Sequence, residues 1–194
     1  CKRVYPIINT IPRLLPDHLK DGLITYDSFF EKYKRHFPKF FADPSSVATL
    51  VKSDITKQKM TQQSFGYQWN VFHQMSTTFE ENFMNYISPI TKKYFKGKYG
   101  LDVGCGFGRH IYYSALFGAE MVGVDVSTAI DATHQNTRDL PNVHLVQADI
   151  YYLPFRKESF DFVYCFGVLH HLPMPFKGFK KIIEVVKSKK DVLI

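Results

Sequence analysis

The chain has 194 residues, a formal net charge of +7 and 45% hydrophobic residues, and these values predict one globular domain with a small appendage. Aromatic residues make up 16% of the sequence, which supplies more apolar surface than a disordered chain carries. No apolar run approaches the roughly 20 residues that a membrane-spanning helix needs, so we expect a soluble, cytoplasmic protein without a transmembrane segment.

Basic residues exceed acidic residues by 25 to 18, and they are spread over three stretches, 32–39, 92–98 and 177–190. This spacing favours solvated helix faces and loops, and it leaves an anionic substrate or a nucleic acid as the alternative. The three cysteines form no C-x-x-C pair, which fits a reducing compartment.

Residues 1–45 form an N-terminal segment that is rich in proline and aromatic residues. Its first three prolines exclude a long helix and allow short extended pieces and turns. From Asp27 to Phe37 the aromatic residues recur at helical spacing, which predicts a helix capped by Asp27. The sequence Asp-Pro-Ser-Ser at 43–46 predicts a break after this helix.

Residues 46–97 are predicted to form a helical lid against the main domain. The part from 47 to 75 is polar and gives no clear pattern, apart from an aromatic cluster at 64–72 around one glycine. Thr78 and Glu81 have the spacing of a capping box, which predicts a helix start. The apolar residues that follow share one helical face: Phe79, Phe83 and Ile87.

From residue 98 to 194, apolar runs of strand length alternate with segments of helical periodicity. The predicted strands are 101–103, 120–126, 143–146, 160–165 and 192–194. The predicted helices are 109–117, 127–137 and 176–187. This alternation predicts an α/β fold, in which a mainly parallel, doubly wound, Rossmann-like sheet carries helices on both faces.

A glycine-rich loop follows the first of these strands and opens a helix. Its sequence, Leu-Asp-Val-Gly-Cys-Gly-Phe-Gly-Arg-His at 101–110, has glycines at 104, 106 and 108. Glycine permits a tight turn and a close approach of the backbone to a ligand, and a helix N-terminus offers free N–H groups. A dinucleotide-binding loop has its third glycine one position later, where Arg109 stands here.

Two further acidic residues follow the next two predicted strands. Asp125 ends the second strand, where a carboxylate can accept hydrogen bonds from both hydroxyls of a ribose. Asp149 follows the third strand, where it can accept from an adenine amino group. The fourth strand leads into the run Val-Leu-His-His-Leu at 168–172.

In this order and at these intervals, the glycine loop, the two acidic strand ends and the His-His run resemble the class I S-adenosylmethionine-dependent methyltransferases. The resemblance is closest to the type 11 group, which contains the quinone-biosynthesis methyltransferases, and it covers about residues 98–194. It implies a methyltransferase (EC 2.1.1.-) that uses S-adenosylmethionine, and releases S-adenosylhomocysteine, while methylating a small molecule, lipid or sugar.

The resemblance also implies roles for individual residues. Asp102 and the backbone of the glycine loop would hold the methionine part of the cofactor, through Gly104, Cys105, Gly106 and Gly108. Asp125 would hold the ribose and Val126 would pack on the adenine. Asp149 and the Ile150 backbone would bind the adenine, while Phe166 and Gly167 would line the site near the sulfonium. The alternative for Asp102 is a buried charge that orients the loop, and for Asp125 and Asp149 it is a turn or cap residue.

The first half of the chain is similar to methyltransferases that carry a small cysteine-rich ribbon ahead of a helical lid. Cys1 would then be a remnant of such a ribbon. Structural zinc takes four ligands, so we expect no metal in this chain. The lid candidates are Tyr67, Gln68 and Trp69, which either cover the cofactor or, for the two aromatic residues, pack against the sheet.

His170 and His171 follow the fourth predicted strand, at the edge where sheets of this kind bind ligands. An imidazole suits a general base near neutral pH, so both are candidate catalytic residues, with a scaffold role as the alternative. His110 is expected on the surface of its helix, with a substrate contact as the alternative.

Two other functions remain open. An RNA methyltransferase would use the basic charge, but the fourth strand ends in Cys-Phe-Gly-Val and lacks the Asn/Asp-Pro-Pro-aromatic motif of enzymes that methylate nucleic-acid amines. The other is a non-catalytic cofactor-binding domain or scaffold that keeps the fold; the presence of all three acidic residues, Asp102, Asp125 and Asp149, argues against decay of the cofactor site. A dinucleotide oxidoreductase is disfavoured by the glycine spacing.

The family resemblance changes the expectation of a complete domain. The resemblance to class I methyltransferases implies a seven-stranded sheet whose last two strands form an antiparallel hairpin. Residues 185–194 match only the approach to the fifth strand, so we expect further strands after Ile194 and a ribbon before Cys1. The oligomeric state is not predicted.

Overall fold

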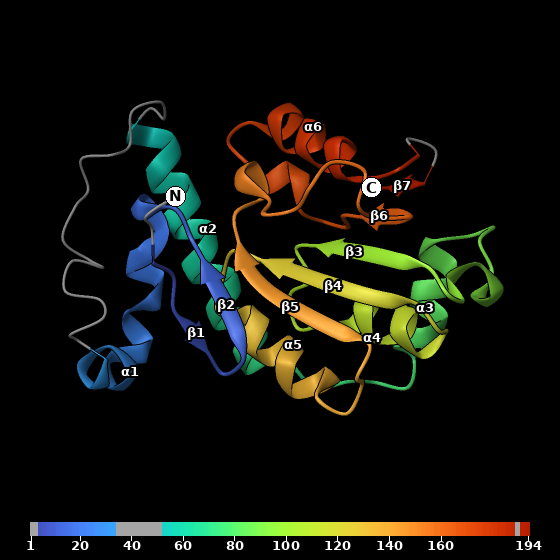
Figure 1. The fold of residues 1–194 in the computed structure, drawn as a ribbon, viewed down its shortest axis with the longest axis horizontal. Coiled ribbons are helices and arrows are strands. Elements are labelled where there is room, and N and C mark those ends of the chain that lie inside the picture. Colours follow the sequence, from blue (N-terminus) through green and yellow to red (C-terminus); the bar gives the residue numbers. More distant parts are fainter. Residues whose placement is uncertain (1–3, 34–51, 189–190) are drawn as a thin grey trace.

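The computed structural model describes residues 4–33, 52–188 and 191–194 (Figure 1). Its strands are β1 (Ile7–Ile8), β2 (Ile11–Leu14), β3 (Tyr99–Val103), β4 (Glu120–Asp125), β5 (Val143–Ala148), β6 (Phe162–Tyr164) and β7 (Val192–Leu193). Its α-helices are α1 (Asp27–Lys32), α2 (Lys52–Val71), α3 (Phe79–Tyr86), α4 (Arg109–Leu116), α5 (Ala129–Thr137) and α6 (Pro175–Val185). Short 3-10 helices span Asp17–Tyr26, Lys92–Phe95, Ile150–Tyr152 and Leu169–His171.

The described strands form one sheet in the order β1-β2-β5-β4-β3-β6-β7. Every neighbouring pair is parallel except β1 and β2, which form an antiparallel hairpin. The chain runs from β3 outward to β5 and then crosses back to β6 on the other side of β3. In such a sheet, ligands bind at the carboxyl ends of the strands, where the strand order reverses. The predicted α/β, mainly parallel fold is therefore confirmed.

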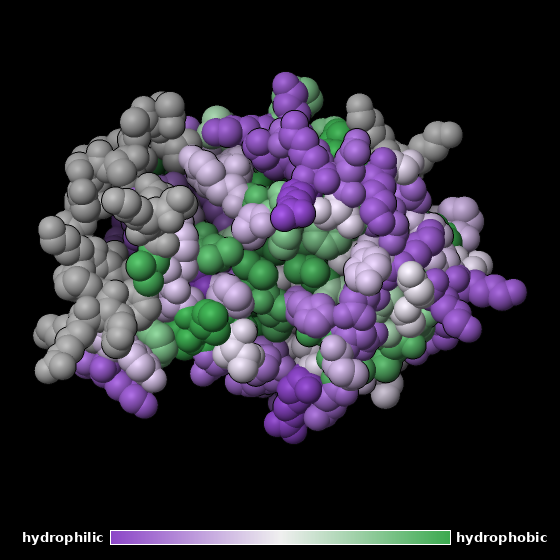
Figure 2. Space-filling view, viewed as in Figure 1, coloured by the Kyte–Doolittle hydropathy of each residue, from purple (hydrophilic) through white to green (hydrophobic). Residues whose placement is uncertain are grey.

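Successive residues of the central strands face opposite sides of the sheet, and each side has its own core. On one side, Leu101, Val103 and Val163 pack with Ile182 and Val185 of α6. On the other side, buried residues of the strands pack with α3 and α4: Met121, Phe162, Tyr164, Phe83 and Ile111. Figure 2 shows hydrophobic side chains gathered in the middle of the face in view, over the strands and between hydrophilic residues.

The N-terminal segment extends the sheet. β2 pairs in parallel with β5, with Arg13 opposite Gln147 and Leu14 opposite Ala148. The ten-residue 3-10 helix follows directly after Pro16, and the predicted helix is present as α1, but the predicted cap is wrong: Asp27 is the first residue of α1, Tyr26 is its N-cap, and no side chain makes a capping hydrogen bond there. Cys1, Phe37 and the expected break at 43–46 lie outside the described residues.

A long helix occupies the region that gave no clear pattern in the sequence. α2 lies across the carboxyl ends of β3, β4 and β5 (Figure 1) and packs against α5 and the loop before it. Gly66 permits this approach, because a Cβ there would lie 2.7 Å from the Thr128 Oγ1 atom. Asn70 completes the contact by donating a hydrogen bond to the Thr128 carbonyl at 3.1 Å.

The helix expected after Thr78 is present as α3, but the predicted capping box is wrong. Thr78 has helical backbone angles, φ −76° and ψ −13°, and its side chain makes no capping hydrogen bond. Ser76 takes part of that role: its carbonyl accepts from the Phe79 N–H at 3.1 Å, and its hydroxyl lies 3.0 Å from the Thr78 hydroxyl. None of the described helices is long and apolar enough to cross a membrane.

Candidate functional site

The glycine loop takes a backbone path that requires glycine. Gly104, Gly106 and Gly108 have φ angles of +81°, +55° and +92°, which side chains of L-residues rarely permit. A Cβ at Gly104 would lie 2.2 Å from a methyl group of Val168, so a side chain is also excluded sterically. Gly108 is the N-cap of α4, and the loop therefore turns tightly from the end of β3 into a helix N-terminus.

Asp102 is buried at the end of β3, and its Oδ2 atom has no hydrogen-bond partner among the described residues. Burial, followed by the charge of Asp125, raises the pKa of Asp102 well above its usual value, while Arg109 acts in the opposite direction. An unpartnered buried carboxylate oxygen is costly unless a donor reaches it. A ligand ammonium group would supply that donor, so the site fits the amino-acid end of the cofactor that the family resemblance implies.

Asp125 ends β4 and holds the loop that surrounds the ligand space. Its Oδ2 atom accepts from the Gly106 N–H at 3.0 Å, and its Oδ1 atom accepts from the Ser127 N–H at 2.8 Å and hydroxyl at 2.7 Å. Burial raises the pKa of Asp125, although these donors lower it. A carboxylate has about four acceptor positions, so capacity remains for ligand hydroxyls.

Asp149 lies at the end of β5 and is almost fully buried. Its Oδ1 atom accepts from the Tyr151 N–H at 3.0 Å, and its Oδ2 atom accepts from the side-chain amide of Gln58 at 3.4 Å. Burial raises the pKa of Asp149, while the Tyr151 N–H, His18, Lys177 and Gln58 lower it in that order. Asp102, Asp125 and Asp149 thus end three adjacent parallel strands.

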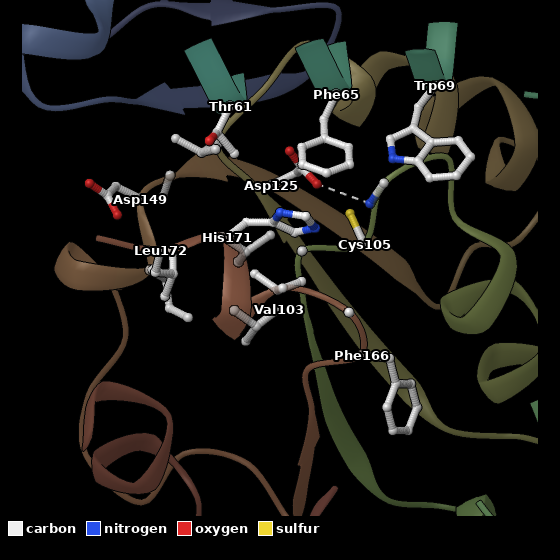
Figure 3. Close-up of a pocket in the computed structure, with 18 of the residues that line it drawn as sticks. Thr61, Phe65, Trp69, Val103, Cys105, Asp125, Asp149, Phe166, His171 and Leu172 are labelled. Carbon is white, nitrogen blue, oxygen red and sulfur yellow. Dashed lines mark hydrogen bonds between the residues drawn. The ribbon is translucent and has the colours of Figure 1, made fainter. Parts of the chain in front are cut away.

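One pocket brings these strand ends together with α2 (Figure 3). Most predicted cofactor residues line it: Gly104, Cys105, Gly106, Asp125, Val126, Asp149, Ile150, Phe166 and Gly167. Asp102 and Gly108 are not among the lining residues. Of the lid candidates Trp69 lines the pocket, whereas Tyr67 is 73% exposed and Gln68 is not part of the lining.

Four residues from the first half of the chain line the pocket although the sequence did not predict them: Leu19, Gln58, Thr61 and Phe65. Together with Trp69, the three from α2 recur at spacings of three and four residues, and Figure 3 shows Thr61, Phe65 and Trp69 coming from one side of the pocket. This helical spacing was the available signal. It was obscured because two of the four, Gln58 and Thr61, are polar, while the apolar Met60 and Tyr67 are exposed elsewhere on the helix.

The two adjacent histidines are placed differently. His171 lines the pocket, where its ring packs edge-on against Phe65 at a centroid distance of 4.8 Å. His170 is exposed and is not among the lining residues. Burial, His170 and Lys57 lower the pKa of His171 below its usual value of 6.5, so the neutral imidazole is its form at pH 7.

The expectation that His110 lies on a helix surface is wrong. His110 is buried, lines the pocket and stacks on Phe83 at 5.4 Å. Burial, with a smaller effect of Arg109, lowers the pKa of His110 to about 3, so its ring is neutral. It is buried because α3, which supplies Phe83, packs on the first turn of α4.

Aromatic rings form part of the remaining pocket wall, beside aliphatic residues and Arg109. Trp69 lies 5.0 Å from Phe107 between ring centroids, and Phe79 packs edge-on against Phe107 from outside the pocket. Asp125 and Asp149 are the only carboxylates among the lining residues, all of which lie in the described part of the chain. Within residues 4–33, 52–188 and 191–194, no group of three His, Cys, Asp or Glu side chains is placed to hold a metal ion.

Residues 101–194 match a sequence family described as "Methyltransferase domain". The chain is 30% identical to the ubiquinone biosynthesis O-methyltransferase of Coxiella burnetii over 150 residues, which cover 72% of this chain and 61% of that protein. It is 36% identical to the tRNA U34 carboxymethyltransferase of Hahella chejuensis over 122 residues, covering 56% of this chain and 33% of that protein. The chain therefore spans less than two thirds of the length of these relatives.

Two solved structures are similar in fold. A SAM-dependent methyltransferase from Aquifex aeolicus matches with a TM-score of 0.52 and 19% identity, over 63% of this chain and 67% of that chain. The Haemonchus contortus phosphoethanolamine N-methyltransferase 1, in complex with phosphoethanolamine and S-adenosylhomocysteine, matches with a TM-score of 0.55 and 15% identity. The latter match covers 72% of this chain and 33% of that chain.

Proposed function

Because this chain carries a class I S-adenosylmethionine-dependent methyltransferase domain, we propose that it transfers a methyl group from S-adenosylmethionine to a small-molecule acceptor. The observation that carries the proposal is a set of three acidic residues near the carboxyl ends of adjacent strands: Asp125 and Asp149 line one pocket, and Asp102 is buried just before its glycine loop. When bound, the sulfonium cofactor would supply the electrophilic methyl group, and the protein would supply binding and orientation.

The chain's residues would bind and orient this cofactor. Asp102 accepts hydrogen bonds from the ammonium group, since its Oδ2 atom has no other partner in the described part of the chain. Asp125 accepts from the ribose hydroxyls, and Asp149 and the Ile150 N–H bind the adenine. Val126 packs against the base, while Phe166 and Gly167 lie near the reacting sulfur.

The acceptor would occupy the aromatic end of the pocket. Phe65, Trp69 and Phe107 line it, and His110 is a neutral ring at its edge. The two lining carboxylates are assigned to the cofactor, so this end offers aromatic surface and the cation of Arg109 rather than an anion for a cationic amine. An aromatic or otherwise apolar molecule with a hydroxyl nucleophile fits this wall, and the O-methyltransferase relatives support that class.

His171 is our candidate general base. Its neutral imidazole can accept a proton from the acceptor hydroxyl as the oxygen attacks the methyl group, and it faces the pocket between Phe65 and the strand ends (Figure 3). The remaining contribution is alignment: α2 excludes water and holds the acceptor in line with the methyl group. Such positioning can lower a barrier by several kcal/mol.

The binding test is calorimetric titration with S-adenosylhomocysteine and, in parallel, with NAD. Saturable binding of the former supports the proposal, whereas binding of NAD without S-adenosylhomocysteine contradicts it. The acceptor class is tested with methyl-labelled S-adenosylmethionine and a panel of phenols, aliphatic alcohols and amines, read by mass spectrometry. Label transferred only to amines would contradict the hydroxyl assignment.

RNA is the second candidate acceptor, because the relatives include tRNA U34 carboxymethyltransferases. The same labelling assay with a tRNA mixture distinguishes the two classes. Label in the tRNA, with none in the small molecules, would replace the small-molecule proposal.

A further inference from the structure

A chain of three buried side chains connects the N-terminal half of the protein to the end of β5. His18, Gln58 and Asp149 come from the first 3-10 helix, from α2 and from the loop after β5, and all three are less than 10% exposed. The His18 Nε2 atom lies 3.0 Å from the Gln58 Oε1 atom, and the Gln58 Nε2 atom donates to the Asp149 Oδ2 atom at 3.4 Å. Two of these three residues lie outside the segment that matches the methyltransferase family.

The direction of the hydrogen bonds follows from the chemistry of the groups. A carboxylate only accepts, so the Gln58 amide must present its NH₂ group to Asp149 and its oxygen to His18. His18 must then carry its proton on Nε2 and donate. If the amide rotated by half a turn, its oxygen would face the carboxylate, and two acceptors would repel each other. The Asp149 carboxylate therefore fixes the orientation of the Gln58 amide, and His18 stabilises it by donating to the amide oxygen.

Gln58 also lines the pocket beside Asp149 and Ile150. With Asp149 ionised, its free lone pairs can accept from the exocyclic amino group of an adenine. A protonated Asp149 would instead offer an O–H donor, which suits the 6-oxo group of a hypoxanthine. Burial raises the pKa of Asp149, and the Gln58 amide is one of the groups that oppose this rise.

We propose that Gln58, held in place by its hydrogen bond with His18, is a positioning residue that makes the site selective for a 6-amino purine over a 6-oxo purine, by keeping the Asp149 carboxylate a hydrogen-bond acceptor. This inference rests on the proposed cofactor. It assigns part of the cofactor specificity to α2, which lies outside the residues 101–194 that match the methyltransferase family.

Gln62 supplies a matched control. It lies one helical turn after Gln58 on α2 and is also buried, but its amide donates to the carbonyls of Leu19 and Val126, at 3.3 and 2.9 Å, and not to Asp149. Gln62→Leu removes a similar amount of hydrogen bonding between α2 and the rest of the protein. It leaves the chain from His18 to Asp149 in place.

The experiment measures dissociation constants of S-adenosylhomocysteine and S-inosylhomocysteine for the wild type, Gln58→Leu and Gln62→Leu. We expect the wild type to prefer the adenosyl ligand, and Gln58→Leu to reduce the ratio of the two constants by about tenfold, since one hydrogen bond to a charged group is lost. Gln62→Leu should weaken the binding of both ligands alike. The ratio of the two dissociation constants should therefore stay within about twofold of the wild-type ratio.

An unchanged ratio in Gln58→Leu, or an equal fall in Gln62→Leu, overturns the inference while the wild-type binding still supports the proposed function. If the wild type does not bind S-adenosylhomocysteine, both are overturned. His18→Phe is a second variant in case Gln58→Leu does not fold. Because it removes the hydrogen bond that holds the Gln58 amide beside Asp149, the ratio should fall in the same direction, and no fall contradicts the proposal.

Discussion

Asp125 both holds the loop around the ligand space and faces that space. Its three hydrogen bonds to Gly106 and Ser127 keep the glycine loop against the end of β4. Asp125→Asn preserves the shape but replaces one acceptor oxygen by a donor. We expect S-adenosylhomocysteine to bind about 10- to 100-fold more weakly, because a charge-assisted hydrogen bond contributes about 1.5–3 kcal/mol. Calorimetry checks this, with Asp139→Asn as an exposed control; equal affinities in both variants would contradict the assigned role.

The state of His171 gives a pH prediction with a defined sign. Burial and the neighbouring charges lower the pKa of His171, and a base must be neutral to accept a proton. Activity should therefore persist as the pH falls through 6.5 and decline only at lower pH, where the ring becomes protonated. The measurement is the pH profile of kcat for the wild type and His171→Gln, which should be slower and should lack this decline.

His144→Gln is the matched control, because His144 lies on β5 in an exposed pair with Glu120 and away from the pocket. Its pH profile should follow the wild type. If His171→Gln retained both the rate and the decline, another group would be the base.

The positions of the three acidic residues could be predicted because each lies at or next to the carboxyl end of an apolar strand, and parallel strands bring these ends together. The burial of His110 could not be predicted in this way. It depends on Phe83, which is 27 residues earlier and reaches His110 only through the packing of α3 on α4. The polar character of Gln58 likewise gave no sign that its side chain lies in the pocket.

An ion pair between Arg13 and Asp131 joins β2 to α5. Arg13 is fully buried, and its two terminal guanidinium nitrogens donate to the Asp131 carboxylate at 2.7 and 3.2 Å. The same nitrogens also donate to the Gln147 side chain and to the Ile8 carbonyl. Asp131→Asn would leave a buried charge without its partner. We expect the free energy of unfolding to fall by about 3 kcal/mol, the lower end for a broken buried pair.

Urea denaturation measures this change, and Glu80→Gln is the control. Glu80 pairs with Lys92 at the surface, where side chains are 40% and 57% exposed. Its removal should cost less than about 1 kcal/mol. Equal losses in the two variants would show that the Arg13 pair does not fasten the hairpin.

The strands and helices after residue 98 were predictable because their apolar runs have strand length and their loops contain glycine or acidic residues. β2 and α2 were not. β2 is a four-residue strand interrupted by Pro12, and it forms because β5 offers a free edge. α2 presents polar residues on much of its surface, so its helical period is weak in the sequence.

At the scale of the whole molecule, the two halves of the chain meet at the pocket. The strand ends supply the acidic residues and the glycine loop, and α2 supplies Gln58, Thr61, Phe65 and Trp69 from the opposite side. The parallel pairing of the strands was predictable from the alternation of strands and helices, and Trp69 was among the predicted lid residues. The contribution of Gln58, Thr61 and Phe65 was not predictable, because it arises from contacts between residues that are far apart in sequence.

This arrangement predicts that ligand binding stabilises both halves together. At a concentration of S-adenosylhomocysteine 100 times its dissociation constant, the native state should gain about 2.7 kcal/mol. Hydrogen–deuterium exchange should then slow in residues 58–69 of α2 as well as in the glycine loop, because the ligand would lie between them. The control region is α3, whose described residues do not line the pocket. Protection restricted to residues 101–172 would mean that α2 does not close over the cofactor, and that the sheet alone binds it.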